Sequence, residues 1–89
     1  MKIEEISELI KEVFTCPLKL EGKIDELYFS IPNPKVHDNE SEGWKLCIKK
    51  AVVTKSSHDC LKSIVEKNKL KMMELKEGYL VIYTPRKAR

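Results

Sequence analysis

The sequence predicts a small α+β domain in which two helices pack on one face of an antiparallel sheet of four or five strands, in the order α-β-β-α-β-β. Two segments place apolar residues at the spacing of a helix, and the other apolar segments alternate with a period of two, as strands do. Strands that follow one another in pairs favour antiparallel neighbours. Because 89 residues suffice for one core, we expect a single domain over 1–89.

Residues 3–14 predict the first helix. Apolar side chains recur there at intervals of three or four residues, from Ile3 to Phe14. Pro17 ends the helix, because a proline disfavours the helical conformation of the residue before it.

Residues 18–31 predict extended chain. The apolar residues are even-numbered in the first part of this segment and odd-numbered in the second. Strand side chains alternate strictly, so this change of phase predicts a bulge or a turn near Asp25-Glu26. One kinked strand and a short hairpin both fit the pattern. A polar loop over 32–43 follows, and its length is typical of functional or mobile connections.

The next two elements are a strand over 44–54 and a second helix that ends near Asn68. The strand alternates apolar and polar residues from Trp44 onward. Ser56 and Asp59 have the spacing of an acidic capping box, so we expect the helix to begin there.

Two further strands, over 70–75 and 79–84, form a hairpin. Gly78 lies in the short turn between them and can adopt a positive φ. Pro85 ends the last strand, and a basic tail over 86–89 follows.

The predicted core combines the apolar residues that these helices and strands direct to one side. It consists of Ile3, Ile6, Ile10, Val13, Phe14, Phe29, Trp44, Leu46, Ile48, Leu61, Ile64, Val65, Leu80 and Ile82.

The charge of the chain is divided between its halves. Residues 1–42 contain five lysines and ten acids, a net charge of −5, whereas residues 43–89 contain twelve basic residues and four acids, a net charge of +8. The modest total of +3 therefore conceals a strongly basic half. Asymmetry of this size suggests a surface for an anionic partner.

The last strand adds aromatic rings to this basic half. If Leu80 and Ile82 face the helices, Tyr79 and Tyr83 stand on the open face of the sheet. Rings and cations on a sheet suit single-stranded RNA or DNA, because bases stack on the rings while lysines neutralise phosphates. The candidate nucleic-acid-binding residues are Lys45, Lys49, Lys69, Lys71, Tyr79, Tyr83, Arg86, Lys87 and Arg89.

The leading functional hypothesis is therefore a non-catalytic module that binds nucleic acid. The alternative is a protein-interaction or assembly subunit, such as a homodimer, which uses the open sheet face or adds a partner strand to the edge strand 70–75. A winged helix, with the C-terminal hairpin as the wing, would need a third helix where residues 18–31 predict extended chain. A stripe formed by Glu4, Glu8 and Glu12 on the first helix suits ordinary solvated surface or a basic partner.

Other chemistry finds little support in the sequence. His58-x-Cys60 and His37-Asp38 are possible metal-ligand pairs, but their spacing matches no standard zinc site. Cys47 or Cys60 beside a histidine would be needed for covalent catalysis, and no spacing predicts that contact. With no glycine-rich phosphate loop either, we expect no enzyme activity, no cofactor and no metal.

The three cysteines suggest reduced thiols, because an odd number cannot all pair and the N-terminal residues do not resemble a secretory signal. We therefore expect a cytoplasmic protein. No apolar run is long enough to span a membrane, so no membrane partner is expected. Abundant Lys and Glu and the absence of Gln lean toward a thermophilic composition.

Overall fold

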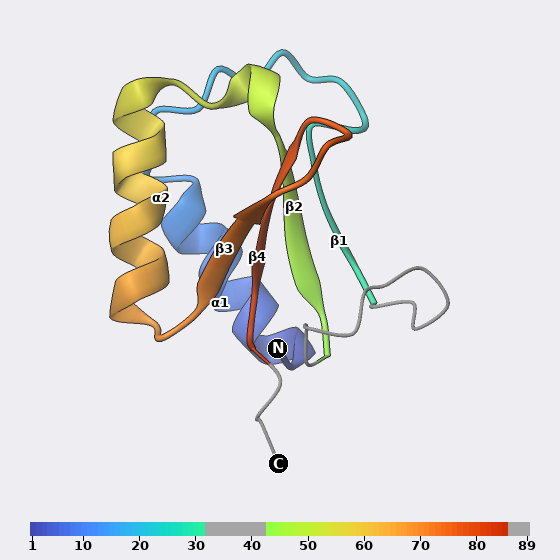
Figure 1. Ribbon diagram of the computed structural model, residues 1–89, viewed down its shortest axis with the longest axis vertical. Coiled ribbons are helices and arrows are strands. Elements are labelled where there is room, and N and C mark those ends of the chain that lie inside the picture. Colours follow the sequence, from blue (N-terminus) through green and yellow to red (C-terminus); the bar gives the residue numbers. More distant parts are fainter. Residues whose placement is uncertain (32–42, 86–89) are drawn as a thin grey trace.

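The protein is described by a computed structural model, which places residues 1–31 and 43–85 (Figure 1). Two α-helices lie on one side of a four-stranded antiparallel sheet, in the predicted order α-β-β-α-β-β. The elements are α1 (Ile3–Val13), β1 (Leu27–Ser30), β2 (Lys45–Lys49), the 3₁₀ turn η2 (Lys50–Val52), α2 (Lys55–Lys67), β3 (Lys71–Glu74) and β4 (Tyr79–Tyr83). The α+β class is thus confirmed, and the sheet formed by the described residues has four strands.

The strand order across the sheet is β1-β2-β4-β3, so β2 and β4 are central and the other two strands are edges. In the register of the central pair, Leu46 lies opposite Ile82 and Ile48 lies opposite Leu80. These four side chains are buried among residues of both helices, which confirms the predicted assignment of the sheet faces. If the list of elements starts at β4 and then continues with α1, β1, β2, α2 and β3, its order is β-α-β-β-α-β. This is the element order of the split βαβ motif, circularly permuted by one strand.

Helix α1 buries a narrower stripe than its sequence predicts. Ile6, Leu9 and Val13 lie in the core, whereas Ile3 is 45% exposed and Phe14 is 56% exposed. The predicted burial of Ile3 and Phe14 is therefore wrong. Ile3 lies in the first turn and Phe14 is the C-cap, so both belong to the ends of the helix, whereas the buried residues lie between them.

The prediction is also wrong for Phe29 in β1, which is 41% exposed. Phe29 lies on an edge strand, and its ring packs edge-on against Trp44 at a centroid distance of 5.7 Å. The sequence analysis missed Met1, whose amino group donates to the Trp44 carbonyl at 3.0 Å while the Trp44 amide donates to the Met1 carbonyl at 2.7 Å. This pairing draws Met1 into the core, where it is 5% exposed.

The segment before β1 is irregular and is neither a kinked strand nor a hairpin. A turn at residues 24–25 precedes β1, close to the predicted change of phase. Glu26 organises this segment, because the residue is 4% exposed and its carboxylate accepts bonds from the amides of Glu21, Gly22 and Lys23 at 2.8–3.1 Å. A buried carboxylate satisfied by backbone amides replaces apolar packing as the anchor of this loop.

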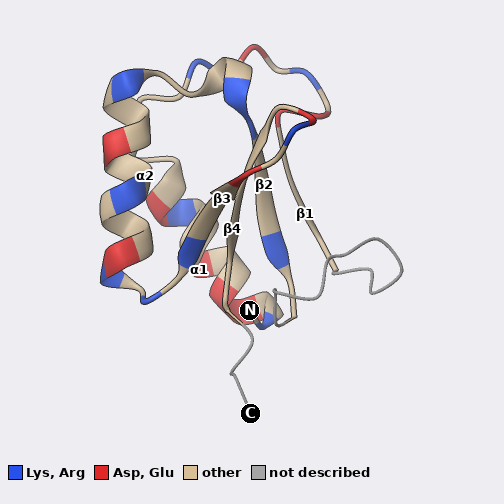
Figure 2. Cartoon of the chain, in the orientation of Figure 1, with Lys and Arg blue, Asp and Glu red and all other residues tan. Residues whose placement is uncertain are grey.

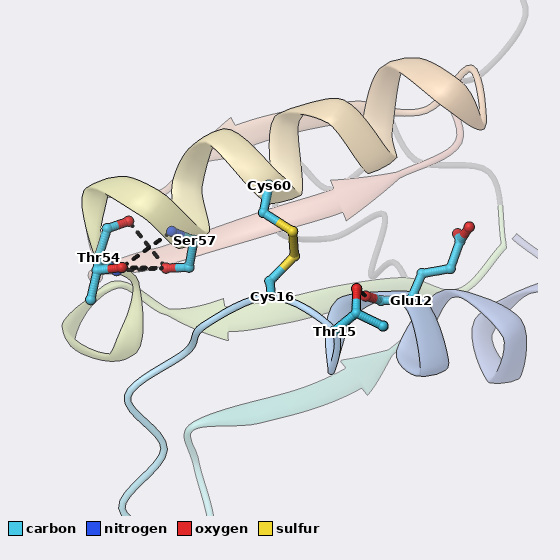
Figure 3. Close-up of a disulfide and its surroundings, with 6 residues drawn as sticks. All are labelled: Glu12, Thr15, Cys16, Thr54, Ser57 and Cys60. Atoms are coloured by element: carbon cyan, nitrogen blue, oxygen red, sulfur yellow. Dashed lines mark hydrogen bonds between the residues drawn. A yellow bond between two sulfur atoms is a disulfide. The ribbon is translucent and has the colours of Figure 1, made fainter.

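Helix α2 begins earlier than expected. Thr54, and not Ser56, is the N-cap: its hydroxyl accepts from the Ser57 amide at 3.1 Å, and the Thr54 amide donates to the Ser57 hydroxyl at 2.7 Å (Figure 3). The predicted strand over 44–54 accordingly ends at Lys49 and gives way to η2. A serine at the third helical position thus takes the part that glutamate usually plays in a capping box.

Cys16 and Cys60 form a disulfide that joins the chain just beyond α1 to α2 (Figure 3). The prediction of reduced thiols is wrong for these two residues, and it holds for Cys47, which is buried and forms no disulfide. Their Cα atoms lie 5.7 Å apart although 44 positions separate them in the sequence. Only the packing of α1 against α2 brings them together, and no local spacing could reveal it.

We predict that Cys16→Ser lowers the free energy of unfolding by about 3–4 kcal/mol, because it removes the constraint on a loop of this length in the unfolded chain. Urea unfolding of the oxidised wild type and of the variant measures the difference. Cys60→Ser is the matched control and should lose the same amount, while a reductant should destabilise the wild type alone. Equal stability of oxidised wild type and variant would contradict the prediction.

We predict that Glu26→Gln destabilises the protein by about 1–3 kcal/mol, because the new amide group turns a donor toward backbone N–H groups and leaves buried polar groups unpaired. Chemical unfolding measures the loss, and faster hydrogen exchange at the amides of Glu21, Gly22 and Lys23 locates it. Glu21→Gln, which changes an exposed carboxylate in the same loop, is the control. A destabilisation equal to that of the control would overturn the anchoring role of Glu26.

Candidate nucleic-acid interface on the open sheet face

The sheet face opposite the helices, called the open face below, combines tyrosines, lysines and small apolar residues. The register defines it in three rows across the strands. These rows are Ser30, Lys45, Tyr83 and Lys71; Tyr28, Cys47, Val81 and Met73; and Lys49 with Tyr79. Cys47, Val81 and Tyr83 form a second buried cluster, against which Leu75 and Tyr79 pack.

The tyrosines of the open face differ in their accessibility. Tyr83 is 9% exposed, so its ring offers little free surface for stacking. Tyr79 is half-buried and Tyr28 is 40% exposed, and their rings meet edge-on at a centroid distance of 5.5 Å. The sequence analysis missed Tyr28, although its place between Leu27 and Phe29 in a period-two segment already put it on the face opposite to theirs.

The predicted lysines occupy three different settings. Lys71 lies opposite Tyr83, and Lys45 occupies the same row on the other neighbouring strand when the register is continued by one residue from the Leu46–Ile82 pair. Lys49 also lies on this face, but its Nζ donates to Asp25 at 3.2 Å. The Tyr79 hydroxyl donates to the Asp25 carbonyl at 3.3 Å, which ties ring, lysine and carboxylate together. The hydrogen bond from Lys49 holds the pKa of Asp25 below its ordinary value.

Lys69 lies outside the sheet, at the end of α2. Its φ of 56° is left-handed, its amide donates to the Glu66 carbonyl at 3.2 Å, and the Leu70 amide donates to the Val65 carbonyl at 2.9 Å. This is the bonding pattern of a Schellman cap, in which glycine is the usual residue. The three other predicted residues, Arg86, Lys87 and Arg89, lie outside the described part of the chain.

Folding brings the acidic and basic halves of the sequence into contact (Figure 2). Lys67 at the end of α2 donates to Glu12 of α1 at 2.9 Å, and Asn68 donates to the same carboxylate at 2.9 Å. These bonds hold the pKa of Glu12 below its ordinary value. Lys49 of β2 likewise pairs with Asp25 of the acidic half, whereas Lys50 pairs with Glu74 inside the basic half. Part of the basic excess of the C-terminal half is thus balanced within the fold, and Figure 2 shows both signs along α2.

The predicted acidic stripe of α1 borders a hollow of about 290 Å³. Glu4, Glu8 and Glu12 line it with Leu9, Leu70 and three further residues. Glu12 is engaged by Lys67 and Asn68, and Glu8 bonds Lys11 at 3.4 Å. The stripe therefore combines internal ion pairs with a shallow, partly apolar surface.

The cysteines that were candidates for other chemistry have structural roles. Cys60 is bonded to Cys16, so it cannot serve with His58 as a metal-ligand pair or act as a nucleophile. Cys47 is 2% exposed beneath the tyrosines. Among residues 1–31 and 43–85, no group of three or more His, Cys, Asp or Glu side chains could hold a metal ion. The pair His37-Asp38 lies outside those ranges.

Burial raises the pKa of Tyr28 to about 12, and the neighbouring Cys47 thiol adds to the effect. Tyr79 and Asp25 raise this pKa further, because each disfavours a second negative charge beside it. The open face therefore holds the Tyr28 hydroxyl in its neutral form.

Comparisons of the chain with models of known protein families, with curated proteins and with solved structures give no match. In the part of the chain that the structure places, no helix has the length and apolar character needed to cross a membrane.

We predict a loss of stability at alkaline pH that depends on the Tyr28 hydroxyl. Its pKa is higher in the folded state than the value of about 10 in an unfolded chain, so its contribution is complete below about pH 10 and is lost as the pH rises toward 12. Tyr28→Phe should therefore lose less stability than wild type between about pH 9 and pH 11. Urea unfolding at both pH values measures this, with Tyr79→Phe as the control for a neighbouring hydroxyl. Parallel losses in wild type and Tyr28→Phe would contradict the assignment.

Proposed function

We propose that the protein is a non-catalytic module that binds single-stranded nucleic acid, RNA or DNA, on the open face of its sheet. One observation carries the proposal: the register sets Lys71 opposite Tyr83 and, continued by one residue from the Leu46–Ile82 pair, Lys45 on its other side, on the same face as the partly exposed rings of Tyr28 and Tyr79. Both helices lie on the opposite face.

The exposure and the charged partners of each residue indicate the part that it takes in binding. Tyr28 and Tyr79 are partly exposed, so they supply the stacking platform, whereas Tyr83 belongs to the buried cluster against which Tyr79 packs. Lys45 and Lys71 neutralise phosphates along one side of the rings. Lys49 contributes less, because Asp25 already compensates its charge. Arg86, Lys87 and Arg89, which lie outside the described part of the chain, add further phosphate contacts in this proposal.

The fold also supports a non-catalytic role. Catalysis by a cysteine needs an accessible thiolate beside a base. Cys60 is consumed in the disulfide and Cys47 lies buried among apolar neighbours. A sheet face with rings and lysines suits an extended single strand.

The cytoplasmic prediction needs a different basis, because it depended on reduced cysteines. Disulfides persist in oxidising compartments and also inside the cells of hyperthermophiles. The Lys- and Glu-rich composition without Gln, combined with the Cys16–Cys60 bond, supports a cytoplasmic protein of a thermophile within our proposal. The alternative function, a protein-interaction subunit, would use the same open face or add a partner strand to the edge strand β3, and it would be insensitive to salt and to nucleic acid.

We predict that Tyr79→Ala weakens binding of a fluorescent single-stranded RNA by about 5- to 100-fold, as expected for the loss of one stacked base. Tyr79→Phe keeps the ring and should bind within about twofold of wild type. Fluorescence anisotropy at low and physiological salt measures both affinities. If the alanine and phenylalanine variants bind alike, the ring does not stack on a base.

The lysines are tested in the same assay through its salt dependence. Lys45→Ala and Lys71→Ala should each reduce the slope of log affinity against log salt by about 0.7, the value for one phosphate contact on a single strand. Lys62→Ala removes an equal charge from α2 on the opposite layer and should leave the slope unchanged. No binding by wild type at low salt would remove the proposed function.

A further inference from the structure

The two edges of the sheet differ in how they are protected against pairing with another strand. Charged side chains on an edge strand discourage such pairing. β3 carries Lys71 and Glu74, which are exposed. β1 has the sequence Leu-Tyr-Phe-Ser and carries no charge. Among the described strands, β1 is therefore the edge open to a partner.

The hydrogen bonds of β1 show which of its backbone groups face outward. The Lys49 amide donates to the Glu26 carbonyl at 2.8 Å, so residue 26 directs its backbone toward β2. In an antiparallel ladder this direction alternates from residue to residue. Leu27, Phe29 and the following Ile31 consequently direct their N–H and C=O groups away from the sheet.

The side chains of the same three residues are apolar and lie on the helix-covered side of the sheet. Leu27 packs against the core, whereas Phe29 is 41% exposed and Ile31 is 63% exposed. The backbone groups that point away from the sheet and the apolar side chains of this edge thus belong to the same residues.

We propose that β1 pairs antiparallel with β1 of a second copy of this chain, about a two-fold axis at Phe29. In this register Phe29 lies opposite Phe29 of the partner and Leu27 lies opposite Ile31, so every pair on the helix side is apolar. All outward backbone groups of the three residues then find partners, and the two four-stranded sheets join into one. An axis at Tyr28 would leave Ile31 unpaired.

A second copy fits this edge better than an unrelated partner because of its symmetry and its charge. A two-fold interface brings each residue near the axis against its own copy, so any charge there would meet a like charge. β1 has none to repel. The same operation on β3 would set Lys71 against Met73 about an axis at Met72, leaving each charge without an opposite partner.

One pair of short strands and the rings beside it bury less than the 1,200–2,000 Å² or so of a standard interface. We therefore expect a dimer that dissociates on dilution. The dimer uses the edge of the sheet and not the open face. The proposal of a dimer can therefore be tested independently of nucleic-acid binding.

Sedimentation equilibrium of the oxidised full chain over a range of concentrations tests the proposal. Wild type should show a reversible monomer–dimer equilibrium. Phe29→Lys places like charges at the axis and should weaken dimerisation by about tenfold or more. Met73→Lys adds the same charge at a similarly exposed position of the other edge strand and should dimerise like wild type. A wild type that stays monomeric, or equal effects of both variants, would overturn the proposal.

Cysteine cross-linking tests the register. Residues paired across the axis have Cα atoms about 5.5 Å apart, within the range of a disulfide. Phe29→Cys should therefore yield a covalent dimer on mild oxidation, seen on a non-reducing gel. Ser30→Cys, whose copies would lie about 8 Å apart, should not. Cross-linking of Ser30→Cys alone, or of neither variant, would refute the register, and circular dichroism checks that both variants are folded.

Discussion

The alternation of side chains along the two central strands is the constraint on which the rest of this structure depends. Leu46 and Ile48 of β2 lie opposite Ile82 and Leu80 of β4, and this apolar surface holds both helices. The residues between them, which include Cys47, must then point the other way, to the face opposite the two described helices. The core and the candidate interface are therefore two sides of one pattern, and a shift of register by one residue would exchange them.

Much of the fold follows from local signals, and the failures share a physical cause. The hairpin turn at Gly78, with a φ of 92°, and the end of α1 before Pro17 could be predicted because each depends on one residue's own conformational limits. The predicted burial of Phe14 and Phe29 was wrong because periodicity identifies the apolar face of a helix or strand. It does not show whether neighbouring elements cover the whole length of that face. The Glu26 anchor and the Cys16–Cys60 bond depend on contacts between segments that no spacing encodes.

The candidate interface was predictable in part for the same reason. Period two placed Lys45, Lys49 and Tyr79 on one face, and the sheet sets Lys49 opposite Tyr79 with Lys45 two rows away. What the sequence could not provide is the environment of each group: Tyr83 is nearly covered, and Asp25 neutralises Lys49. Net charge was the weakest guide, because ion pairs between the acidic and basic halves consume part of the excess that made the C-terminal half conspicuous.

The disulfide also divides the chain mechanically. β1, β2 and the segment between them lie inside the loop that Cys16 and Cys60 close, whereas β3 and β4 lie outside it. Because β4 pairs with β2, the central strand pair of the sheet joins the disulfide-closed loop to the C-terminal hairpin outside it. A force applied to the two ends of the chain would separate the β3–β4 hairpin from β2 by breaking the hydrogen bonds between β4 and β2. The disulfide would keep the loop from Cys16 to Cys60 closed, so about 150 Å of extended chain could not be released. In the oxidised protein this loop would resist stretching, whereas the β3–β4 hairpin would unfold.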